Sequence, residues 1–269
     1  MVDSDSQSIP ARRALVLLVL AYTVLAVAVS VINPLFESPD EIRHYRYVRV
    51  LVTEHRLPVQ GTETVRSQSH HPPLYYALSA LLSGWVPSSH DGEFQQAINP
   101  FWGYRSFSTG VDNKLQYWHA PVEPWGGGYF AALLSRWVNV AIGAATIVVT
   151  YALAWQALWG ECRRADSPDV RPKLALAAAA IVAFNPQFIY LSAAINNDTI
   201  AALAGAGILW ASVVVTRDGP SIRNLVILGA VSGLGLLAKL QVGALGIPVI
   251  LALVLAAWQS RDWTRWLRS

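Results

Sequence analysis

The chain has 269 residues, of which 54% are hydrophobic and only 14% are charged. A soluble domain carries about 25% charged residues, so this composition excludes an ordinary soluble globular protein and an intrinsically disordered one. The single cysteine, Cys162, excludes an intrachain disulfide scaffold and gives no sign of redox chemistry. The formal net charge is only +3. The chain is therefore predicted to be a membrane protein.

Six long apolar runs follow one another along the chain. A transmembrane helix needs about 20 apolar residues, with a range of about 17 to 25, and each run has roughly this length or more. We therefore expect an all-α polytopic membrane protein with about six transmembrane helices, in one transmembrane domain over residues 14–258. The runs are Ala14–Phe36, Tyr129–Trp159, Leu174–Ile195, Thr199–Val215, Ser221–Ala238 and Val242–Trp258.

The basic residues predict the orientation of these helices, because short cytoplasmic connections are rich in Lys and Arg. Among the short connections the basic residues fall on alternate ones: the connection at Asn196–Asp198 holds none, and between the fifth and sixth runs there is only Lys239. The large loop also holds basic residues, but a loop of this length is largely exempt from the rule. We therefore expect a cytoplasmic tail at residues 1–13, a basic cytoplasmic tail at 259–269 and a large extracytoplasmic loop at 37–128. Since topology explains these charges, we expect a multi-pass protein of the cell membrane without a nucleic-acid partner. The residues on the predicted cytoplasmic side are Arg12, Arg13, Arg163, Arg164, Arg171, Lys173, Arg217, Arg223, Arg261, Arg265 and Arg268.

The first run has a competing interpretation as a cleaved signal peptide, in which Arg12 and Arg13 form the basic region before the apolar core. The apolar core of a signal peptide has about 7 to 15 residues, which is shorter than this run. A retained signal anchor is therefore the better interpretation.

The large loop begins with the sequence Ser38-Pro39-Asp40-Glu41. This pattern fits a capping box with Pro39 at the first helical position, so a helix should start here. Apolar residues then recur at helical spacing, which predicts an interfacial helix along the membrane surface with its apolar stripe inward. This stripe comprises Ile42, Tyr45, Val48 or Arg49, and Val52.

Asp40 and Glu41 have a structural and a functional interpretation. Acidic residues in the first turn of a helix are favoured by the helix dipole. A carboxylate at the outer membrane surface is also suited to act as a general base toward a hydroxyl, and His44 follows one turn later. Glu41 and His44 have the spacing of a metal site, but two ligands are weak evidence. We therefore expect no cofactor, and a divalent metal is the weaker alternative.

A second short helix is predicted after the double proline at Pro72 and Pro73, in an apolar stretch of about 13 residues that ends near Val86. This stretch is too short to span a membrane, which favours an interfacial or re-entrant helix. His70 and His71 precede it and titrate near neutral pH. They either position a phosphate or sugar opposite Asp40 or belong to an ordinary loop, and the sequence favours neither interpretation.

Three further polar features lie on the same predicted side. Aromatic residues between 99 and 128 suit a headgroup belt better than sugar stacking. The turn Asn196–Thr199 either caps the next helix or lines a cavity. Lys239 ends an apolar helix and is either functional or snorkels to the surface. The aromatic residues are Phe101, Trp102, Tyr104, Phe107, Tyr117, Trp118 and Trp125.

Several blocks in this order resemble the GT-C superfamily of polyprenyl-phosphate-dependent glycosyltransferases. The nearest types are bacterial relatives of the protein O-mannosyltransferases and the lipid A aminoarabinose transferases. The resemblance covers nearly the whole chain. Its blocks are Ser38–Glu41, His71–Tyr76, Leu134–Gly143, Asn185–Asp198 and Gly233–Lys239.

The resemblance implies a polyprenyl-phosphate-linked sugar donor and an inverting transfer to an acceptor hydroxyl at the extracytoplasmic face. It identifies Asp40 with the general base, while Glu41 would orient the acceptor or Asp40. The acceptor is a protein, a lipid or a glycan. The phosphate leaving group needs positive charge, for which Arg43, His70, His71 and Lys239 are the candidates. Further residues assigned to substrate binding are His44, Tyr75, Asn197 and Asp198.

Family members usually have about twice as many transmembrane helices, so the chain resembles an N-terminal portion of such an enzyme. The rival interpretation is a non-catalytic membrane protein, either a sugar-lipid-binding or assembly subunit or half of a transporter. Transporters place ionisable or helix-breaking residues near the middle of the bilayer. Here only Arg136 and Pro186 are obvious candidates, which disfavours a transporter. A binding-only role stays open, because a sugar-lipid pocket without turnover would use the same residues.

Overall fold

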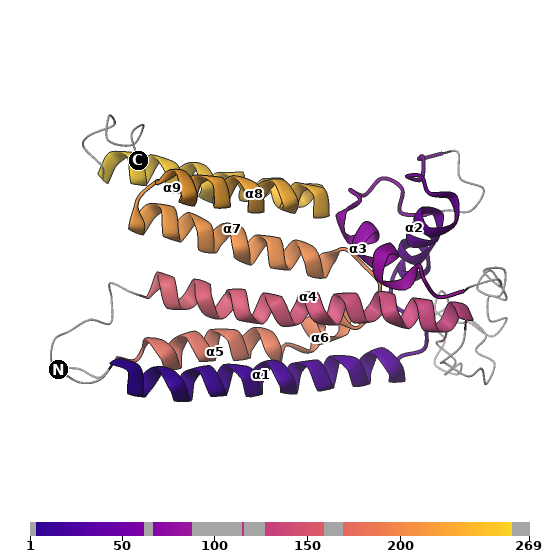
Figure 1. Ribbon diagram of the computed structural model, residues 1–269, viewed down its shortest axis with the longest axis horizontal. Helices are drawn as coiled ribbons and strands as arrows, with labels where there is room; N and C mark the ends of the chain where they lie inside the picture. The colour runs from indigo at the N-terminus through magenta and orange to yellow at the C-terminus, as the bar shows by residue number, and fades with distance from the viewer. Residues whose placement is uncertain (1–3, 62–66, 88–114, 116–126, 159–168, 260–269) are drawn as a thin grey trace, which may run out of the picture.

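The computed structural model describes residues 4–61, 67–87, 115, 127–158 and 169–259. Helices make up its architecture, and the long ones lie side by side in an elongated bundle (Figure 1). The predicted all-α fold with apolar helices of membrane-spanning length is therefore confirmed. The helices are α1 (Ser4–Ile32), α2 (Glu41–Glu54), α3 (Leu74–Ser83), α4 (Gly127–Ala157), α5 (Arg171–Ala183), α6 (Pro186–Ser192), α7 (Asp198–Asp218), α8 (Ile222–Ala238), a 3-10 helix (Leu240–Leu245) and α9 (Gly246–Gln259).

The number of helices that can span a membrane is lower than the six predicted. Within the described residues, α1, α4, α7 and the stretch Leu240–Gln259 are long and apolar enough, and α5 with α6 makes a fifth if the bent pair is one span. The fifth predicted run is α8, which has only 17 residues. At 1.5 Å per residue it is about 25 Å long, less than a hydrocarbon core of about 30 Å.

The third predicted run is broken because its sequence stops one helix and starts another. The side-chain oxygen of Asn185 accepts hydrogen bonds from the backbone N–H groups of Gln187 and Phe188, and Pro186 occupies the first turn of α6. A proline there lacks an N–H that a continuous helix would use. The axes of α5 and α6 consequently differ by 62°.

Helix α4 lies at the centre of the bundle and packs against α1, α3, α5, α6 and α7. Its close approach to α1 depends on Gly143. A Cβ atom at this position would lie 1.8 Å from the Tyr22 hydroxyl oxygen and 2.9 Å from the Ser192 hydroxyl oxygen. Small residues allow membrane helices to approach in this way, where no hydrophobic effect drives them together.

Helices α2 and α3 form a cap at one end of the bundle, opposite the end where α1 begins and α9 finishes (Figure 1). Both helices were predicted from the sequence and both are present, while their interfacial position stays a prediction. The predicted apolar stripe of α2 supplies Ile42, Tyr45 and Val48 to a buried cluster, which Tyr75 and Tyr76 of α3 complete. This packing fixes the polar residues that precede each helix.

Candidate functional site

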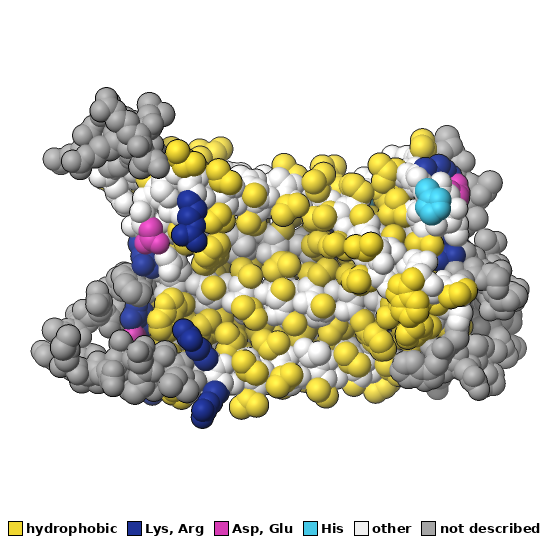
Figure 2. All heavy atoms as spheres, viewed as in Figure 1, with side chains coloured by type: hydrophobic (Ala, Val, Ile, Leu, Met, Phe, Trp, Pro, Cys, Tyr) yellow, Lys and Arg dark blue, Asp and Glu magenta, His cyan; other side chains and the backbone are white. Residues whose placement is uncertain are grey.

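Polar residues from α2, the start of α3, the start of α7 and the end of α8 meet at the capped end of the bundle. Figure 2 shows that hydrophobic side chains cover the middle of the visible face, whereas charged and histidine side chains gather toward its ends. Lys239 and Asp198 both influence the pKa of His44 and of His71, so these four residues lie within electrostatic reach of one another. We call the group Asp40, Arg43, His44, His70, His71, Asp198 and Lys239 the polar cluster.

His44 is the buried centre of the polar cluster. Its Nδ1 shares a hydrogen bond of 2.7 Å with the Tyr76 hydroxyl, and its ring stacks on that of His71 at a centroid distance of 5.7 Å. Burial, assisted by the neighbouring His71, lowers the pKa of His44 to about 3. The imidazole is therefore neutral at physiological pH and can orient a substrate by hydrogen bonding only.

His70 and His71 adjoin His44 from the loop before α3. Their rings are 4.1 Å apart, and the backbone carbonyl of His71 accepts a hydrogen bond of 3.4 Å from the Tyr47 hydroxyl. Burial, then His70 and Lys239, lower the pKa of His71, while Asp198 and Asp40 oppose this shift. His71 is thus electrostatically coupled to both Asp40 and Lys239.

Asp40 lies at the rim of the polar cluster, with its side chain half exposed and 3.1 Å from the Arg43 guanidinium. Its backbone is in the left-handed region, with φ of 56°. The capping-box prediction is wrong: helix α2 begins at Glu41, and Asp40 makes no side-chain cap. The Ser38 hydroxyl instead accepts a hydrogen bond from Asn33.

Glu41 is fully buried and faces away from solvent, because its carboxylate has stronger partners than the helix end. Its Oε1 accepts hydrogen bonds from Arg136 Nε at 2.7 Å and from the backbone N–H of Ile195 at 2.9 Å. Its Oε2 accepts from Arg136 Nη2 at 2.7 Å and from the N–H of Phe36 at 2.9 Å. The carboxylate is held beside Asp40 but does not reach the exposed surface.

Arg136 is the site residue that the sequence motifs did not assign. Besides Glu41, its guanidinium donates to the carbonyls of Ser30, Asn33 and Pro34 at 2.6, 2.7 and 3.0 Å. These groups lie at and just beyond the end of α1, where carbonyls lack helical partners. Its position within an apolar run could have indicated a functional role, because charged residues within such runs are rare and have a partner.

Asp198 and Lys239 form an ion pair between the start of α7 and the end of α8. The predicted capping role of the turn belongs to Asn196, whose side-chain oxygen accepts from the N–H of Asp198 at 2.9 Å. Asn197 is fully buried, and its amide donates to the carbonyl of Ala238, one residue before Lys239. Its Oδ1 has no hydrogen-bond partner among the described residues.

Tyr75 lies apart from the polar cluster. It is fully buried, its hydroxyl donates to the carbonyl of Ser135 on α4, and burial raises its pKa. It packs α3 onto α4, whereas Tyr76 is the tyrosine that contacts His44. The predicted aromatic residues Phe101 to Trp125 lie outside the described residues. Among those described, no group of three His, Cys, Asp or Glu residues has the arrangement of a metal site.

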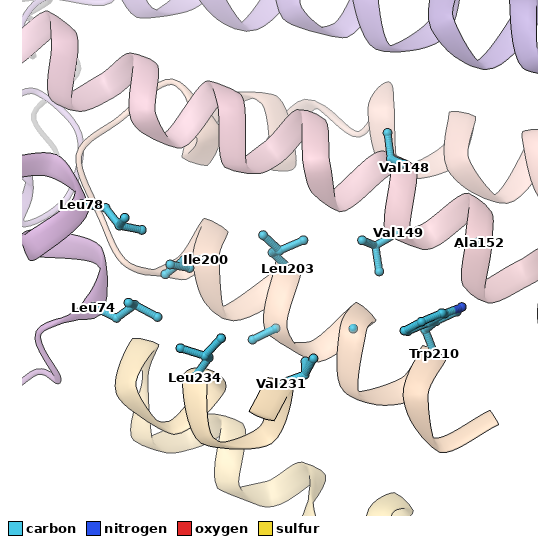
Figure 3. A pocket seen from close by; sticks show the side chains of 12 residues that line it. Leu74, Leu78, Val148, Val149, Ala152, Ile200, Leu203, Trp210, Val231 and Leu234 are labelled. Carbon is cyan, nitrogen blue, oxygen red and sulfur yellow. The ribbon is translucent and has the colours of Figure 1, made fainter. Parts of the chain in front are cut away.

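An apolar cavity of about 520 Å³ begins beside α3 and extends between α4, α7 and α8. Figure 3 shows Leu74 and Leu78 at one end and Trp210 near the other. Ile200 lines the cavity two residues after Asp198, and Leu234 lines it five residues before Lys239. The cavity therefore starts next to the polar cluster and leads away from it along the bundle.

Comparison with protein families identifies the chain. A family model described as dolichyl-phosphate-mannose-protein mannosyltransferase matches residues 118–268, which is more than half of the sequence. The matched stretch contains Arg136, Asp198 and Lys239 but not Asp40 or Glu41. Neither the curated proteins nor the solved structures yield a match. The chain therefore belongs to the dolichyl-phosphate-mannose-protein mannosyltransferase family, which confirms the resemblance to GT-C glycosyltransferases.

Proposed function

We propose that the protein transfers a sugar from a polyprenyl-phosphate donor to an acceptor hydroxyl, with inversion at the anomeric carbon and Asp40 as the general base. One observation carries the proposal. The polar cluster lies next to one end of a cavity lined by apolar side chains, so the head and the tail of an anionic lipid would have adjacent sites. Family membership supports a lipid-linked sugar as the donor.

The cavity suits an isoprenoid chain. All its lining residues are apolar, and they come from α3, α4, α7 and α8 (Figure 3). Burying apolar carbon contributes about 0.8 kcal/mol per CH₂ group. A tail in the cavity would hold the donor phosphate near Lys239, because Leu234 lies in the last two turns of α8 and Lys239 directly follows this helix.

In the proposed reaction, the acceptor hydroxyl loses its proton to the Asp40 carboxylate as its oxygen bonds to the anomeric carbon. The bond between that carbon and the phosphate oxygen breaks, and its electron pair leaves with polyprenyl phosphate. The half-exposed position of Asp40 supports this role, because an acceptor can approach it from solvent. Buried Glu41 is assigned to orienting Asp40 and not the acceptor.

Positive charge must stabilise the departing phosphate. Lys239 is the main candidate, because its ammonium group already binds a carboxylate oxygen of Asp198 that a phosphate oxygen would replace. Arg43 lies beside Asp40 and is the second candidate. Neutral His44 and His71 would hydrogen-bond to the sugar or the phosphate, and exposed His70 adds a further polar contact.

The basic residues on the opposite side of the predicted spans support an extracytoplasmic position for the polar cluster. Arg12 and Arg13 lie at the beginning of α1, and Arg217 and Arg223 flank the connection between α7 and α8. These positions are at the far end of the bundle from α2 and α3 (Figure 1). The acceptor would then be a protein, lipid or glycan exposed outside the cytoplasm.

The test is sugar transfer by membranes containing the full chain, using radiolabelled polyprenyl-phosphate mannose and related donors with serine- and threonine-containing peptides, lipids and glycans as acceptors. General-base catalysis contributes about 10²- to 10⁴-fold, so Asp40→Asn should reduce transfer by at least about 100-fold. Glu54→Gln, at the exposed end of the helix that follows Asp40, is the matched control and should transfer normally. Undiminished transfer by Asp40→Asn would remove Asp40 from the base role. Donor binding without any transfer would favour a binding subunit.

A further inference from the structure

Arg136 and Glu41 form a buried hub that joins four separate parts of the chain. The hub comprises this ion pair, the carbonyls at the end of α1, the N–H of Phe36 and the N–H of Ile195. We propose that Arg136 is a positioning residue, which acts through Glu41 to fix the general base relative to the donor-binding pair. The inference rests on the proposed function, because it concerns the geometry of the same reaction.

The hub stabilises a strained segment that leads into the proposed base. Phe36 and Asp40 both have positive φ values, 69° and 56°, which are uncommon for residues other than glycine and are an outlier for a bulky side chain. Such conformations are unfavourable and persist only where the surroundings hold them. Glu41 holds both, because it follows Asp40 directly and accepts a hydrogen bond from the N–H of Phe36.

The same carboxylate also controls the donor side of the polar cluster. Glu41 Oε1 accepts from the N–H of Ile195, and the next residue, Asn196, caps the start of α7. Asp198 in that first turn forms the ion pair with Lys239. A single carboxylate therefore connects the segment of Asp40 to the turn that places Lys239 and Asp198.

The Arg136 guanidinium is suited to positioning because each of its N–H donors has a hydrogen-bond acceptor. Arginine has five N–H donors in a fixed planar fork, and Arg136 uses them on two carboxylate oxygens and three carbonyls. Both side chains of the ion pair are 0% exposed. Replacing a buried ion pair by apolar residues of similar size is often neutral or stabilising. The fixed orientation that the pair gives to its partners therefore explains it better than stability does.

The experiment compares the full chain with Arg136→Lys, Glu41→Gln, the double variant Arg136→Gln with Glu41→Gln, and Ile147→Ala. Lysine keeps the charge but cannot form the two-pronged contact, and the double variant leaves no unpaired buried charge. Ile147 lies in the core about three turns further along α4 and serves as a destabilised control. The readouts are kcat and KM for polyprenyl-phosphate mannose, detergent melting temperature, and amide exchange of the segment containing Ile195.

We expect kcat to fall about 100-fold in the three hub variants, the loss typical of a misplacement of about 1 Å, while KM changes less than about threefold. Ile147→Ala should keep its kcat at a comparable melting temperature. Exchange of the Ile195 amide should accelerate in Arg136→Lys and in the double variant. If the double variant is folded and retains the wild-type kcat, the hub does not position the reaction.

The two proposals can fail separately. Absence of transfer by the wild-type chain with every donor and acceptor would refute the proposed function, yet the amide-exchange measurement would still test the hub. Transfer by the wild-type chain with kcat in the hub variants equal to that of Ile147→Ala would refute the positioning role alone. Unchanged exchange at Ile195 would show that Glu41 does not hold the turn before α7.

Discussion

The apolar cavity gives the sharpest prediction, because it can be narrowed without touching the polar cluster. Ala152 lines it from α4, near the end at which Trp210 lies (Figure 3). Replacing Ala152 by phenylalanine would occupy part of the cavity far from Leu74 and Leu78. If an isoprenoid tail lies there, Ala152→Phe should displace its distal part and leave the donor phosphate in place.

The magnitude follows from the size of one isoprene unit. A drug-sized ligand gains about 0.3 kcal/mol per non-hydrogen atom, so five carbons contribute about 1.5 kcal/mol. This corresponds to about tenfold in affinity. Ala152→Phe should therefore raise KM about tenfold for a long-chain donor and much less for a short-chain donor that does not reach Ala152, with kcat nearly unchanged.

The assay is transfer from polyprenyl-phosphate mannose of two or more chain lengths, measured in detergent at several donor concentrations. Ala141→Phe is the matched control, because Ala141 is exposed on the same helix and lines neither the cavity nor the polar cluster. If a folded Ala152→Phe protein keeps the wild-type KM for the long-chain donor, the cavity does not hold the tail. An equal rise in KM for both chain lengths would also contradict the proposed position.

Three further predictions concern packing, protonation and orientation. Gly143→Ala should lower the free energy of unfolding by about 1 to 3 kcal/mol, because its methyl group would overlap the Tyr22 hydroxyl; thermal unfolding should show part of this loss recovered by adding Tyr22→Phe. The pKa of His44 is about 3 in the folded protein and 6.5 for a free imidazole. At a pH between these two values, His44 is therefore protonated in the unfolded chain and neutral in the folded one. Stability should consequently fall on acidification below pH 6.5, by up to about 1.4 kcal/mol per unit, and His44→Phe should weaken this dependence of the melting temperature. Cys162, in a segment outside the described residues, is predicted to be cytoplasmic, so an impermeant thiol reagent should label it only after cells are permeabilised; labelling of intact cells would reverse the proposed orientation.

The fold could be predicted where it depends on a local sequence pattern or on the length of an apolar run. Apolar runs located the bundle, the double proline located α3, and helical spacing located α2 together with its buried face. The third run shows the limit of hydropathy, since Asn185 and Pro186 break an otherwise apolar segment. A proline in such a segment ends or kinks a helix, but the sequence alone does not say whether the next helix continues in the same direction.

The candidate site was predictable only in part, because its key contacts join residues far apart in the sequence. Glu41 fitted a local capping role, yet its partner is Arg136, which lies 95 residues further along the chain. The attraction between a carboxylate and a guanidinium is stronger in the buried interior than the attraction between a carboxylate and a helix end in water. Glu41 therefore pairs with the distant Arg136 and does not cap its own helix. Likewise, Tyr75 and Tyr76 are equivalent in sequence, and only the packing of α3 decides which of them faces His44.

Helix α4 relates the two halves of the proposed site. Arg136 fixes Glu41 near one end of it, and Val148, Val149 and Ala152 line the cavity further along the same helix. Sixteen residues separate Arg136 from Ala152, which is about 24 Å at 1.5 Å per residue. Because a helix is rigid over this distance, it would hold the proposed base and a lipid tail in a constant relation, as positions on loops would not. A tail in the cavity would then add affinity for the donor at a fixed distance from Asp40, and such uniform binding changes KM and not kcat.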